Sequence, residues 1–299
     1  MLFICYHLKV SAVNMQAGEI ITRAGSSQMP KKQNTRIAAI GVDRGGTWTR
    51  VAALDSRLRP IRTARIRTAP LRSLPKKLLP LVSRWPGGTE APLVIATRGA
   101  FSKPWKKPFL FKALSPKLNL IKVISDAEAA HFAAFRGKTG LLLIAGTGAV
   151  AFTGRPGAFK KTGGFNPASG DPGSGRWLGR QYLSIRGRLR EAGQMGHGRS
   201  AAYAKRIISL ALSGNERCAE LAARAQGELA ALLKEAAGKT AAPIKAALAG
   251  GLIANQYFRA GLLIKIKQAL KGRKIVFVKT LLPAEQAAAR LALQGRKPR

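Results

Sequence analysis

The most constraining feature of the sequence is a hairpin pattern that occurs twice, far apart in the chain. Residues 36–55 read RIAAIGVDRGGTWTRVAALD, in which two apolar runs flank a polar turn with two glycines. Residues 139–153, TGLLLIAGTGAVAFT, repeat strand, glycine tip and strand in pattern though not in letters. Each segment predicts a β-hairpin, and a glycine tip lets backbone N–H groups approach phosphate oxygens. One such hairpin is weak evidence, because an ordinary glycine turn has the same pattern, but its repetition favours a phosphate site.

Aspartates stand at or near the ends of predicted strands. Asp43 ends the first strand and is placed to hold a hydrated Mg²⁺. Asp126 follows the strand-like run 119–125 where an alanine-rich helix begins, and its local chemistry is that of an N-cap. Asp171 lies among glycines, before a helix expected from Ser174. These aspartates are the candidates for catalysis and binding.

Another glycine pair follows later in the chain, at a predicted junction of strand and helix. Residues 246–255, AALAGGLIAN, predict a short apolar strand that runs into Gly250 and Gly251 and then a helix. Two glycines at this junction would let a flat ring lie against the backbone without a Cβ in the way. KIVFVK at 274–279 predicts another strand, and residues 282–293 predict a closing helix.

Length and composition favour a folded chain with two cores. The 299 residues are 46% hydrophobic, and alanine, leucine and charges at helical spacing predict amphipathic helices from 198 to 240. No run approaches the length of about 18 apolar residues that a membrane-spanning helix needs, so we expect no membrane segment. The two cysteines, Cys5 and Cys218, provide neither a disulfide framework nor a ligand set for zinc or an iron–sulfur cluster. We expect a cytoplasmic protein.

The charge of the chain is extreme. There are 52 Lys and Arg against 13 Asp and Glu, which gives a formal net charge of +39. The basic residues recur from Lys31 to Arg299, and they are neither gathered into a tail nor interleaved with aromatic residues. Scattered charges are screened over about 8 Å at physiological salt. We therefore interpret the charge as a surface property, with non-specific binding of polyanions as a side effect.

The N-terminal segment stands apart from these motifs. It opens with MLFICYHLKVSAV, which has no preceding basic residue and is interrupted by Lys9, so the features of a secretory signal are not met. The patterned sequence begins abruptly after Met29. We expect residues 1–35 to be an extension or a disordered tail, and an added strand or helix is the alternative.

In their order, these motifs resemble the sugar-kinase and actin superfamily of ATPases. The closest resemblance is to the N-acetylglucosamine kinase-like members of the BadF/BadG/BcrA/BcrD ATPase family. DRGGT at 43–47 stands where that family has Asp-Gly-Gly-Gly-Thr, and SDA at 125–127 where it has Asn-Asp-Ala. GTGA at 146–149 matches the second phosphate loop. GDPGSG at 170–175, followed by WLG at 177–179, matches Gly-Asp-Glu-Gly-Ser-Gly and its Trp-Leu-Gly.

The resemblance implies an α/β fold of two ribonuclease-H-like domains, the actin-like ATPase fold, with a nucleotide cleft between them. Residues 36–131 plus 283–299 would form the N-terminal domain, and residues 132–282 the C-terminal domain. The implied activity is that of an ATP-dependent sugar kinase. It would use ATP and Mg²⁺ to phosphorylate an amino sugar such as N-acetylglucosamine on its primary hydroxyl. Relatives of this size commonly form homodimers, although the sequence leaves the oligomeric state open.

The resemblance also implies residue roles. Asp126 would accept the proton of the attacking hydroxyl, and Asp43 would act on the metal through water. Asp171, next to Gly170, would bind sugar hydroxyls. The positions that would hold the phosphates and border the nucleotide are Gly45, Gly46, Thr47, Gly146, Thr147, Gly148, Gly250, Gly251 and Asn255.

Some positions depart from the family pattern. Arg44 replaces a glycine, and it either assists phosphate binding or obstructs the loop. Ser125 replaces Asn, and Pro172 replaces Glu, which removes a carboxylate from the sugar side. Trp48 is a candidate to stack on a sugar face, although a single Trp in a strand more often belongs to the core.

Other functions compete with a sugar kinase. An activator of 2-hydroxyacyl-CoA dehydratases would need cysteines for an iron–sulfur cluster, and Cys218 stands alone in a helical stretch. A zinc-containing sugar kinase would need a cysteine cluster, and His197 resembles its histidine segment only superficially. A catalytically altered actin-like ATPase with a regulatory or nucleic-acid-associated role is favoured by the charge and by Arg44. Against that role, three of the 13 acidic residues stand at motif positions.

Overall fold

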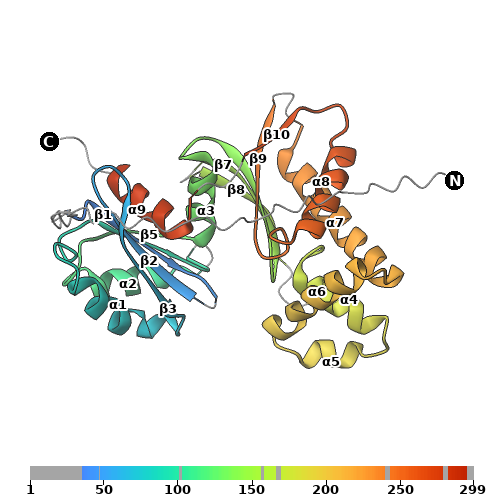
Figure 1. Cartoon of the computed structure of the whole chain (residues 1–299), viewed down its shortest axis with the longest axis horizontal. Helices are drawn as coiled ribbons and strands as arrows, with labels where there is room; N and C mark the ends of the chain where they lie inside the picture. The colour runs from blue at the N-terminus through green and yellow to red at the C-terminus, as the bar shows by residue number, and fades with distance from the viewer. Residues whose placement is uncertain are drawn as a thin grey trace, which may run out of the picture. The chain divides into compact units, whose positions relative to one another are not determined.

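The computed structural model describes most of the chain after residue 35. The described residues are 36–46, 48–100, 103–155, 158–165, 170–239, 243–278 and 282–294. The extension predicted at 1–35 lies outside the described residues. The described part contains two five-stranded mixed sheets with helices packed on them, which confirms the predicted α/β fold (Figure 1).

The first sheet has the strand order β3-β2-β1-β4-β5. β1 pairs with β2, and β2 with β3, in an antiparallel sense, whereas β4 and β5 run parallel to β1. The carboxyl ends of β1, β4 and β5 therefore meet at one edge, where the register aligns Asp43 with Ala96 and Ala96 with Ile124. The strand bounds are Ala39–Arg44 for β1, Trp48–Leu54 for β2, Pro60–Arg67 for β3, Leu93–Thr97 for β4 and Leu120–Ile124 for β5.

The second sheet repeats the arrangement of the first. Its order is β10-β9-β6-β7-β8, with β6, β7 and β8 antiparallel and β9 and β10 parallel to β6. The repeated hairpin of the sequence therefore forms the start of each sheet, as β1–β2 and as β6–β7. The strand bounds are Gly140–Ala145 for β6, Ala149–Arg155 for β7, Ala158–Gly163 for β8, Ile244–Ala249 for β9 and Ile275–Phe277 for β10.

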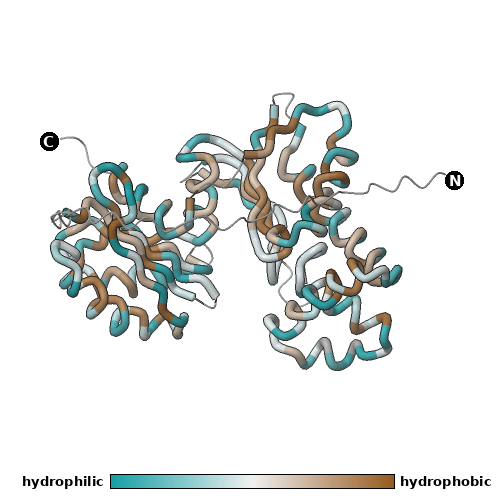
Figure 2. Tube along the Cα trace, in the orientation of Figure 1, coloured by the Kyte–Doolittle hydropathy of each residue, from teal (hydrophilic) through white to brown (hydrophobic). Residues whose placement is uncertain are grey.

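Helices connect the strands and cover the sheets. Figure 2 shows apolar residues concentrated along the strands of both sheets, with polar residues toward the helix surfaces and loops. The predicted amphipathic region from 198 to 240 forms two long helices, α6 and α7. The helix bounds are Leu71–Ser73 (the 3₁₀ helix η1), Leu74–Ser83 (α1), Lys106–Leu114 (α2), Asp126–Phe135 (α3), Gly175–Ser184 (α4), Leu189–Gln194 (α5), His197–Leu212 (α6), Glu216–Ala237 (α7), Gln256–Ala269 (α8) and Ala284–Gln294 (α9).

Each sheet has its own buried core. α1 and α2 pack on one face of the first sheet, and the alanine-rich face of α9 packs on the other. Gly41 in β1 permits this close approach, because a Cβ at that position would lie 1.9 Å from the carbonyl oxygen of Glu285. The final helix thus returns to the first sheet. α4, α6, α7 and α8 bury the core of the second sheet. The predicted domain boundaries remain a prediction.

No helix of the described residues combines the length and the apolar character that spanning the hydrocarbon layer requires.

Candidate active site

Asp43 lies near the carboxyl end of β1, and its side chain is buried. Its Oδ2 accepts a hydrogen bond from Arg50 Nη1 at 3.5 Å, because the antiparallel register places the two residues opposite one another. Burial raises the pKa of Asp43 to about 6; Glu285 contributes to the rise and Arg50 opposes it. A buried carboxylate with so little compensation fits a position that receives a cation.

The tip of the first hairpin presents backbone to its surroundings. The N–H of Gly45 donates to the carbonyl of Trp48 at 3.1 Å and closes the turn. Gly46 is exposed, and the nearest atom to a Cβ built there would be Arg98 Nη1, at 3.8 Å. Thr47 lies outside the described residues. The space in front of Gly46 is therefore open to a ligand and faces a guanidinium group.

Asp126 is the first residue of α3, and the prediction that it is the N-cap is wrong. The N-cap is Ser125, whose Oγ accepts from the N–H of Glu128 at 3.1 Å, while the Glu128 carboxylate accepts from the N–H of Ser125 at 2.7 Å. This reciprocal pair satisfies the helix terminus. Asp126 therefore has no capping role, and its Oδ1 accepts a bond at 3.1 Å from the N–H of Ala127.

The electrostatic surroundings of Asp126 favour a proton acceptor. Burial raises its pKa above the ordinary value, and the Ala127 N–H, Arg98 and Lys106 act in the opposite direction. A carboxylate that has lost solvation without a close ion pair is more basic than one on the surface. Such a group is suited to general-base chemistry near neutral pH.

The tip of the second hairpin is fixed by the helix that follows it. Within the tip, the N–H of Gly146 donates to the carbonyl of Gly148 at 2.9 Å. The N–H groups of Gly175 and Arg176, at the start of α4, donate to the carbonyls of Gly146 and Thr147 at 2.7 and 3.2 Å. The loop that the sequence predicted as a phosphate site is thus held against a helix N-terminus.

Asp171 is positioned by the second hairpin. Its Oδ2 accepts a hydrogen bond from the N–H of Ala149 at 3.3 Å, and a Cβ on Gly148 would lie 3.0 Å from the same oxygen. Gly170 adopts a φ of +86°, and a Cβ there would lie 2.8 Å from the backbone nitrogen of Trp177, so this position requires glycine. Gly170 therefore sets the path of the loop that carries Asp171.

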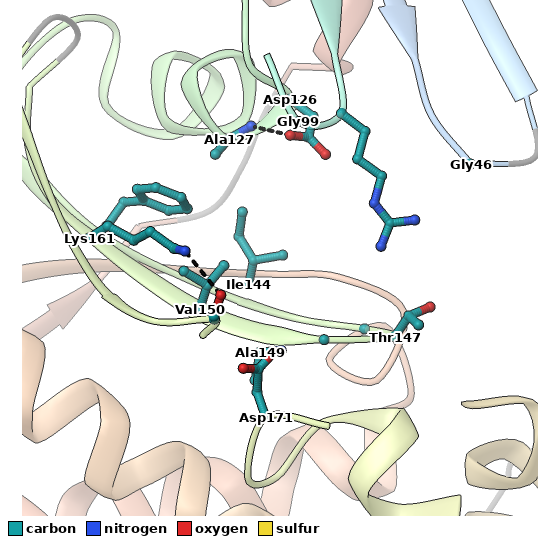
Figure 3. A pocket seen from close by; sticks show the side chains of 15 residues that line it. Gly46, Gly99, Asp126, Ala127, Ile144, Thr147, Ala149, Val150, Lys161 and Asp171 are labelled. Carbon is teal, nitrogen blue, oxygen red and sulfur yellow. Dashed lines mark hydrogen bonds between the residues drawn. The ribbon is translucent and has the colours of Figure 1, made fainter. Parts of the chain in front are cut away.

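One cavity of about 440 Å³ brings several of these residues together, whereas Asp43 and Gly45 are not among its lining residues. Figure 3 shows Asp126 and Asp171 on opposite sides of it, with Thr147 and Gly46 along one end. The predicted site residues that line this cavity are Gly46, Asp126, Gly146, Thr147, Gly148 and Asp171. The cavity thus joins a basic carboxylate, a second carboxylate and two glycine tips, which is an arrangement suited to a phosphate-bearing ligand and a polyol.

The residues predicted to border the nucleotide, Gly250, Gly251 and Asn255, are not among the residues that line this cavity. The two glycines lie beside the second glycine tip. Gly250 has a φ of +109°, and a Cβ there would lie 2.2 Å from the carbonyl oxygen of Ala145. A Cβ on Gly146 would lie 3.7 Å from the nitrogen of Gly251, so the two glycine loops are neighbours. Asn255 is the N-cap of α8, where its Oδ1 accepts from the N–H of Phe258 at 3.0 Å.

Trp48 is not among the residues that line the cavity, and its role at a sugar face remains a prediction. It is half-buried in β2, and the guanidinium carbons of Arg65 and Arg67 lie 3.8 and 4.4 Å from its ring centroid. Two arginines of β3 therefore stack on one aromatic ring of β2. The contact depends on cross-strand register, which pairs Trp48 with Arg67 and brings residues distant in the sequence together.

The cavity lining includes two cationic residues, Arg98 and Lys161, that were not predicted from the sequence. Arg98 follows β4, whose carboxyl end lies beside that of β1, and ligand sites in such sheets gather at this edge. Recognising the strand 93–97 would have provided the signal. Lys161 lies in β8 and donates to the carbonyl of Gly164 at 3.0 Å. Arg44 is directed elsewhere, since its Nη2 donates to the carbonyl of Ala69 at 2.6 Å.

Candidate metal ligands are few. Within the described ranges, no group of three or more His, Cys, Asp or Glu residues is arranged to hold a metal ion. Cys218 is buried in the core between the second sheet and its helices. Mg²⁺ usually keeps several waters and uses one or two carboxylates together with substrate phosphates. A single buried Asp43 beside a glycine tip fits that mode of binding.

Comparisons with known proteins give structural likeness alone. No protein-family model matches the sequence, and no curated protein matches it. The chain is similar to the structure of a protein assigned as an N-acetylglucosamine kinase from Chromobacterium violaceum, at 20% identity and a TM-score of 0.62 over 87% of this chain and 99% of that chain. A protein with the same assignment from Porphyromonas gingivalis matches at 17% identity and a TM-score of 0.62, over 85% and 97%.

A third similar structure is a ROK family glucokinase from Streptomyces griseus in complex with glucose and AMPPNP. It matches at 17% identity and a TM-score of 0.55, over 86% of this chain and 99% of that chain. The fold is the two-domain actin-like ATPase fold of sugar kinases. At these identities the sugar-kinase fold is established, and the catalytic activity is a separate question that the site geometry addresses.

Proposed function

We propose that this protein is an ATP-dependent sugar kinase that phosphorylates an amino sugar such as N-acetylglucosamine on its primary hydroxyl. One observation carries the proposal: a basic carboxylate, Asp126, and both glycine tips line the same cavity. Solved structures with this fold add support, since two that the chain resembles are assigned as N-acetylglucosamine kinases.

The chemistry follows from the position of Asp126. The acceptor hydroxyl oxygen forms a bond to the γ-phosphorus of ATP, the bond between that phosphorus and the β,γ-bridging oxygen breaks, and ADP leaves with the electron pair. The hydroxyl proton passes to the Asp126 carboxylate. The raised pKa of Asp126, caused mainly by burial, suits it to hold that proton.

The phosphates and their metal ion have matching groups on the chain. The backbone at Gly46 and at 146–148 would receive the phosphates, because glycines leave these tips open to the cavity. Asp43 would hold Mg²⁺ through water, and the ion would supply charge neutralisation to the phosphates. Asp43 has the required character, since it is a buried carboxylate whose pKa burial raises to about 6.

The acceptor sugar would lie between the two carboxylates. Asp171 faces Asp126 across the cavity (Figure 3) and has one oxygen engaged by the hairpin backbone. A carboxylate oxygen accepts more than one hydrogen bond, so Asp171 retains capacity for sugar hydroxyls. The nucleotide base would lie near Gly250 and Gly251, because two glycines leave room for a flat ring against the backbone.

The test is a coupled ADP-release assay with ATP and Mg²⁺ across a panel of free sugars, on the wild type and Asp126→Asn. We expect sugar-dependent release in the wild type and a loss of at least about 10²-fold in the variant, because the general base is removed. Glu220→Gln is the matched control, since Glu220 is exposed on α7 and is not among the residues that line the cavity. Absence of sugar-stimulated release by the wild type would refute the proposal.

A regulatory or nucleic-acid-associated role for an altered ATPase of this fold is the second candidate. It is favoured by the stacked Trp48, Arg65 and Arg67 and by the Arg50 contact with Asp43. Such a protein would bind a defined oligonucleotide sequence in preference to a scrambled one. Equal binding of both, with a steep loss of affinity in salt, is what the net charge alone predicts.

A further inference from the structure

Arg98 is a cation of the cavity lining with no role in the proposed function. It follows β4 at the edge where the carboxyl ends of β1 and β5 also lie, so it stands between the strand that carries Asp43 and the one that leads to Asp126. It lines the cavity together with Gly46 and Asp126. The backbone carbonyl of Arg98 accepts a hydrogen bond from Lys106 Nζ at 2.6 Å, which helps to hold this turn in place.

The charged end of Arg98 lies at the first glycine tip. Its Nη1 would be 3.8 Å from a Cβ on Gly46, and this is the nearest atom that such a Cβ would meet. Arg98 also acts on Asp126, whose pKa it lowers against the larger effect of burial. The guanidinium group therefore lies close enough to influence both the tip and the proposed base.

Other cations near the cavity already have partners. Arg44 donates to the carbonyl of Ala69, Arg50 pairs with Asp43, and Lys161 donates to the carbonyl of Gly164. For the Arg98 guanidinium, the described part of the chain shows no hydrogen-bond acceptor. Its donors are therefore available to a ligand in the cavity.

A guanidinium group at this place matches one chemical group best. Its planar donors fit the oxygens of a phosphate in pairs, whereas an ammonium group acts as a point charge. In phosphoryl transfer the negative charge spreads over the three equatorial oxygens of the transferred group, and a cation aimed at them lowers the barrier. The transferred group must lie between the glycine tip and the base, which is where Arg98 is directed.

We propose that Arg98 is a catalytic residue that binds the γ-phosphoryl group of ATP during its transfer to the acceptor. The inference rests on the proposed kinase function and adds to it a cation from the chain itself. As the phosphorus bond to the β,γ-bridging oxygen breaks and the bond to the acceptor oxygen forms, Arg98 donates to the equatorial oxygens. The proton of the acceptor hydroxyl goes to Asp126, and Arg98 neither gains nor loses a proton.

The first experiment measures binding and needs no acceptor sugar. Calorimetric Kd values are compared for AMPPNP and for ADP, each with Mg²⁺, in the wild type, Arg98→Ala and Arg98→Lys. We expect Arg98→Ala to weaken AMPPNP by about 10- to 100-fold, the range for a lost charged hydrogen bond, while ADP changes by less than about twofold. The affinity of Arg98→Lys for AMPPNP should lie between those of the wild type and Arg98→Ala, because lysine keeps the charge and loses the planar pair of donors.

Controls separate local from global effects. Arg84→Ala removes an exposed arginine at the end of α1 and should bind both nucleotides as the wild type does. An equal loss of AMPPNP and ADP affinity in Arg98→Ala, or unchanged AMPPNP affinity, would overturn the proposal. If the alanine variant does not fold, Arg98→Gln with the same two ligands decides the question.

A second experiment uses turnover. In Arg98→Ala, kcat should fall by about 10³-fold or more, as when arginine is lost from other phosphoryl-transfer sites, with KM for the acceptor unchanged. Added guanidinium ion should restore part of that kcat and none of the kcat lost in Asp126→Asn. A rise in KM for acidic sugars alone would assign Arg98 to an anionic acceptor and refute the phosphoryl role. If the wild type turns over no sugar, the kinase proposal fails, and the AMPPNP-to-ADP ratio still tests Arg98.

Discussion

Replacing Asp43 by Asn should stabilise the folded protein at neutral pH and have little effect in acid. Burial raises the pKa of this carboxyl from 3.8 to about 6, with Glu285 adding to the rise and Arg50 opposing it. A raised pKa means that the folded state binds the proton more tightly than the unfolded chain does. The penalty for the charged carboxylate is therefore absent below pH 4, and it is incurred as the pH rises through about 6.

The size of the effect follows from the same pKa values. At pH 8 the carboxylate is charged in both states, and the difference between pKa 3.8 and about 6 corresponds to about 3 kcal/mol. The residue is 7% exposed, so solvent screening reduces this figure little. Asp43→Asn removes the charge and should raise the free energy of unfolding by up to that amount, with the gain fading toward pH 4.

The assay is urea unfolding of both proteins from pH 4 to pH 8, without nucleotide or Mg²⁺. Asp55→Asn is the control of opposite sign. The N–H of Arg59 donates to Asp55 at 2.8 Å, and this bond and the Arg59 guanidinium lower the pKa of Asp55, so its charged form stabilises the fold at neutral pH. Asp55→Asn should therefore be destabilising at pH 8, and less so in acid. An Asp43→Asn variant no more stable than the wild type at pH 8, or a difference independent of pH, would refute the reasoning.

The remaining predictions concern the loops and the cavity. Gly250→Ala should cost about 1–3 kcal/mol of stability, because its Cβ would lie 2.2 Å from the Ala145 carbonyl oxygen at a φ of +109°. Gly227→Ala, inside α7 with open space around the new Cβ, should instead stabilise by about 0.5–1 kcal/mol; thermal unfolding distinguishes the two. Asp171→Asn should raise KM for the sugar by about tenfold and leave KM for ATP unchanged in initial-rate assays, and an effect confined to ATP would contradict the assignment. The acidic limb of kcat/KM against pH should lie above the ordinary range of an aspartate, because burial raises the pKa of Asp126 and activity is lost as the pH falls through it; a limb near pH 4 would contradict this.

The sheet cores could be predicted because their signals are local. Each hairpin combines apolar runs with a glycine tip, and both the apolar alternation and the turn chemistry can be read without knowing the rest of the fold. The register of β1 with β2 and of β6 with β7 agrees with those patterns. The two tips then share a cavity, a relation that the sequence suggested only through resemblance.

The start of α3 carries a local signal that was missed, which is the capping-box spacing of Ser125 and Glu128. Ser and Asp both cap helices well, so composition alone does not choose between Ser125 and Asp126. The choice depends on Glu128, which completes a capping box with Ser125 in the structure. This shift by one residue turns Asp126 from a cap into a carboxylate that lines the cavity.

The other features that sequence reasoning missed depend on long-range pairing. Trp48 contacts Arg65 and Arg67 because β2 and β3 pair in register, and neither contact has a signal at short sequence distance. Arg98 reaches Gly46 because β4 runs parallel to β1 after a crossover that includes α1. Such neighbours become visible only when the strand order is known.

The measurement that tests the central claim most directly is the fate of the γ-phosphate itself. Wild-type protein is incubated with γ-³²P-labelled ATP, Mg²⁺ and each amino sugar in turn, and the products are separated into sugar phosphate and inorganic phosphate. We expect labelled sugar phosphate in an amount equal to the ADP formed, and we expect Asp126→Asn to form none. Label found in inorganic phosphate alone, or ATP left intact with every sugar, would contradict the central claim.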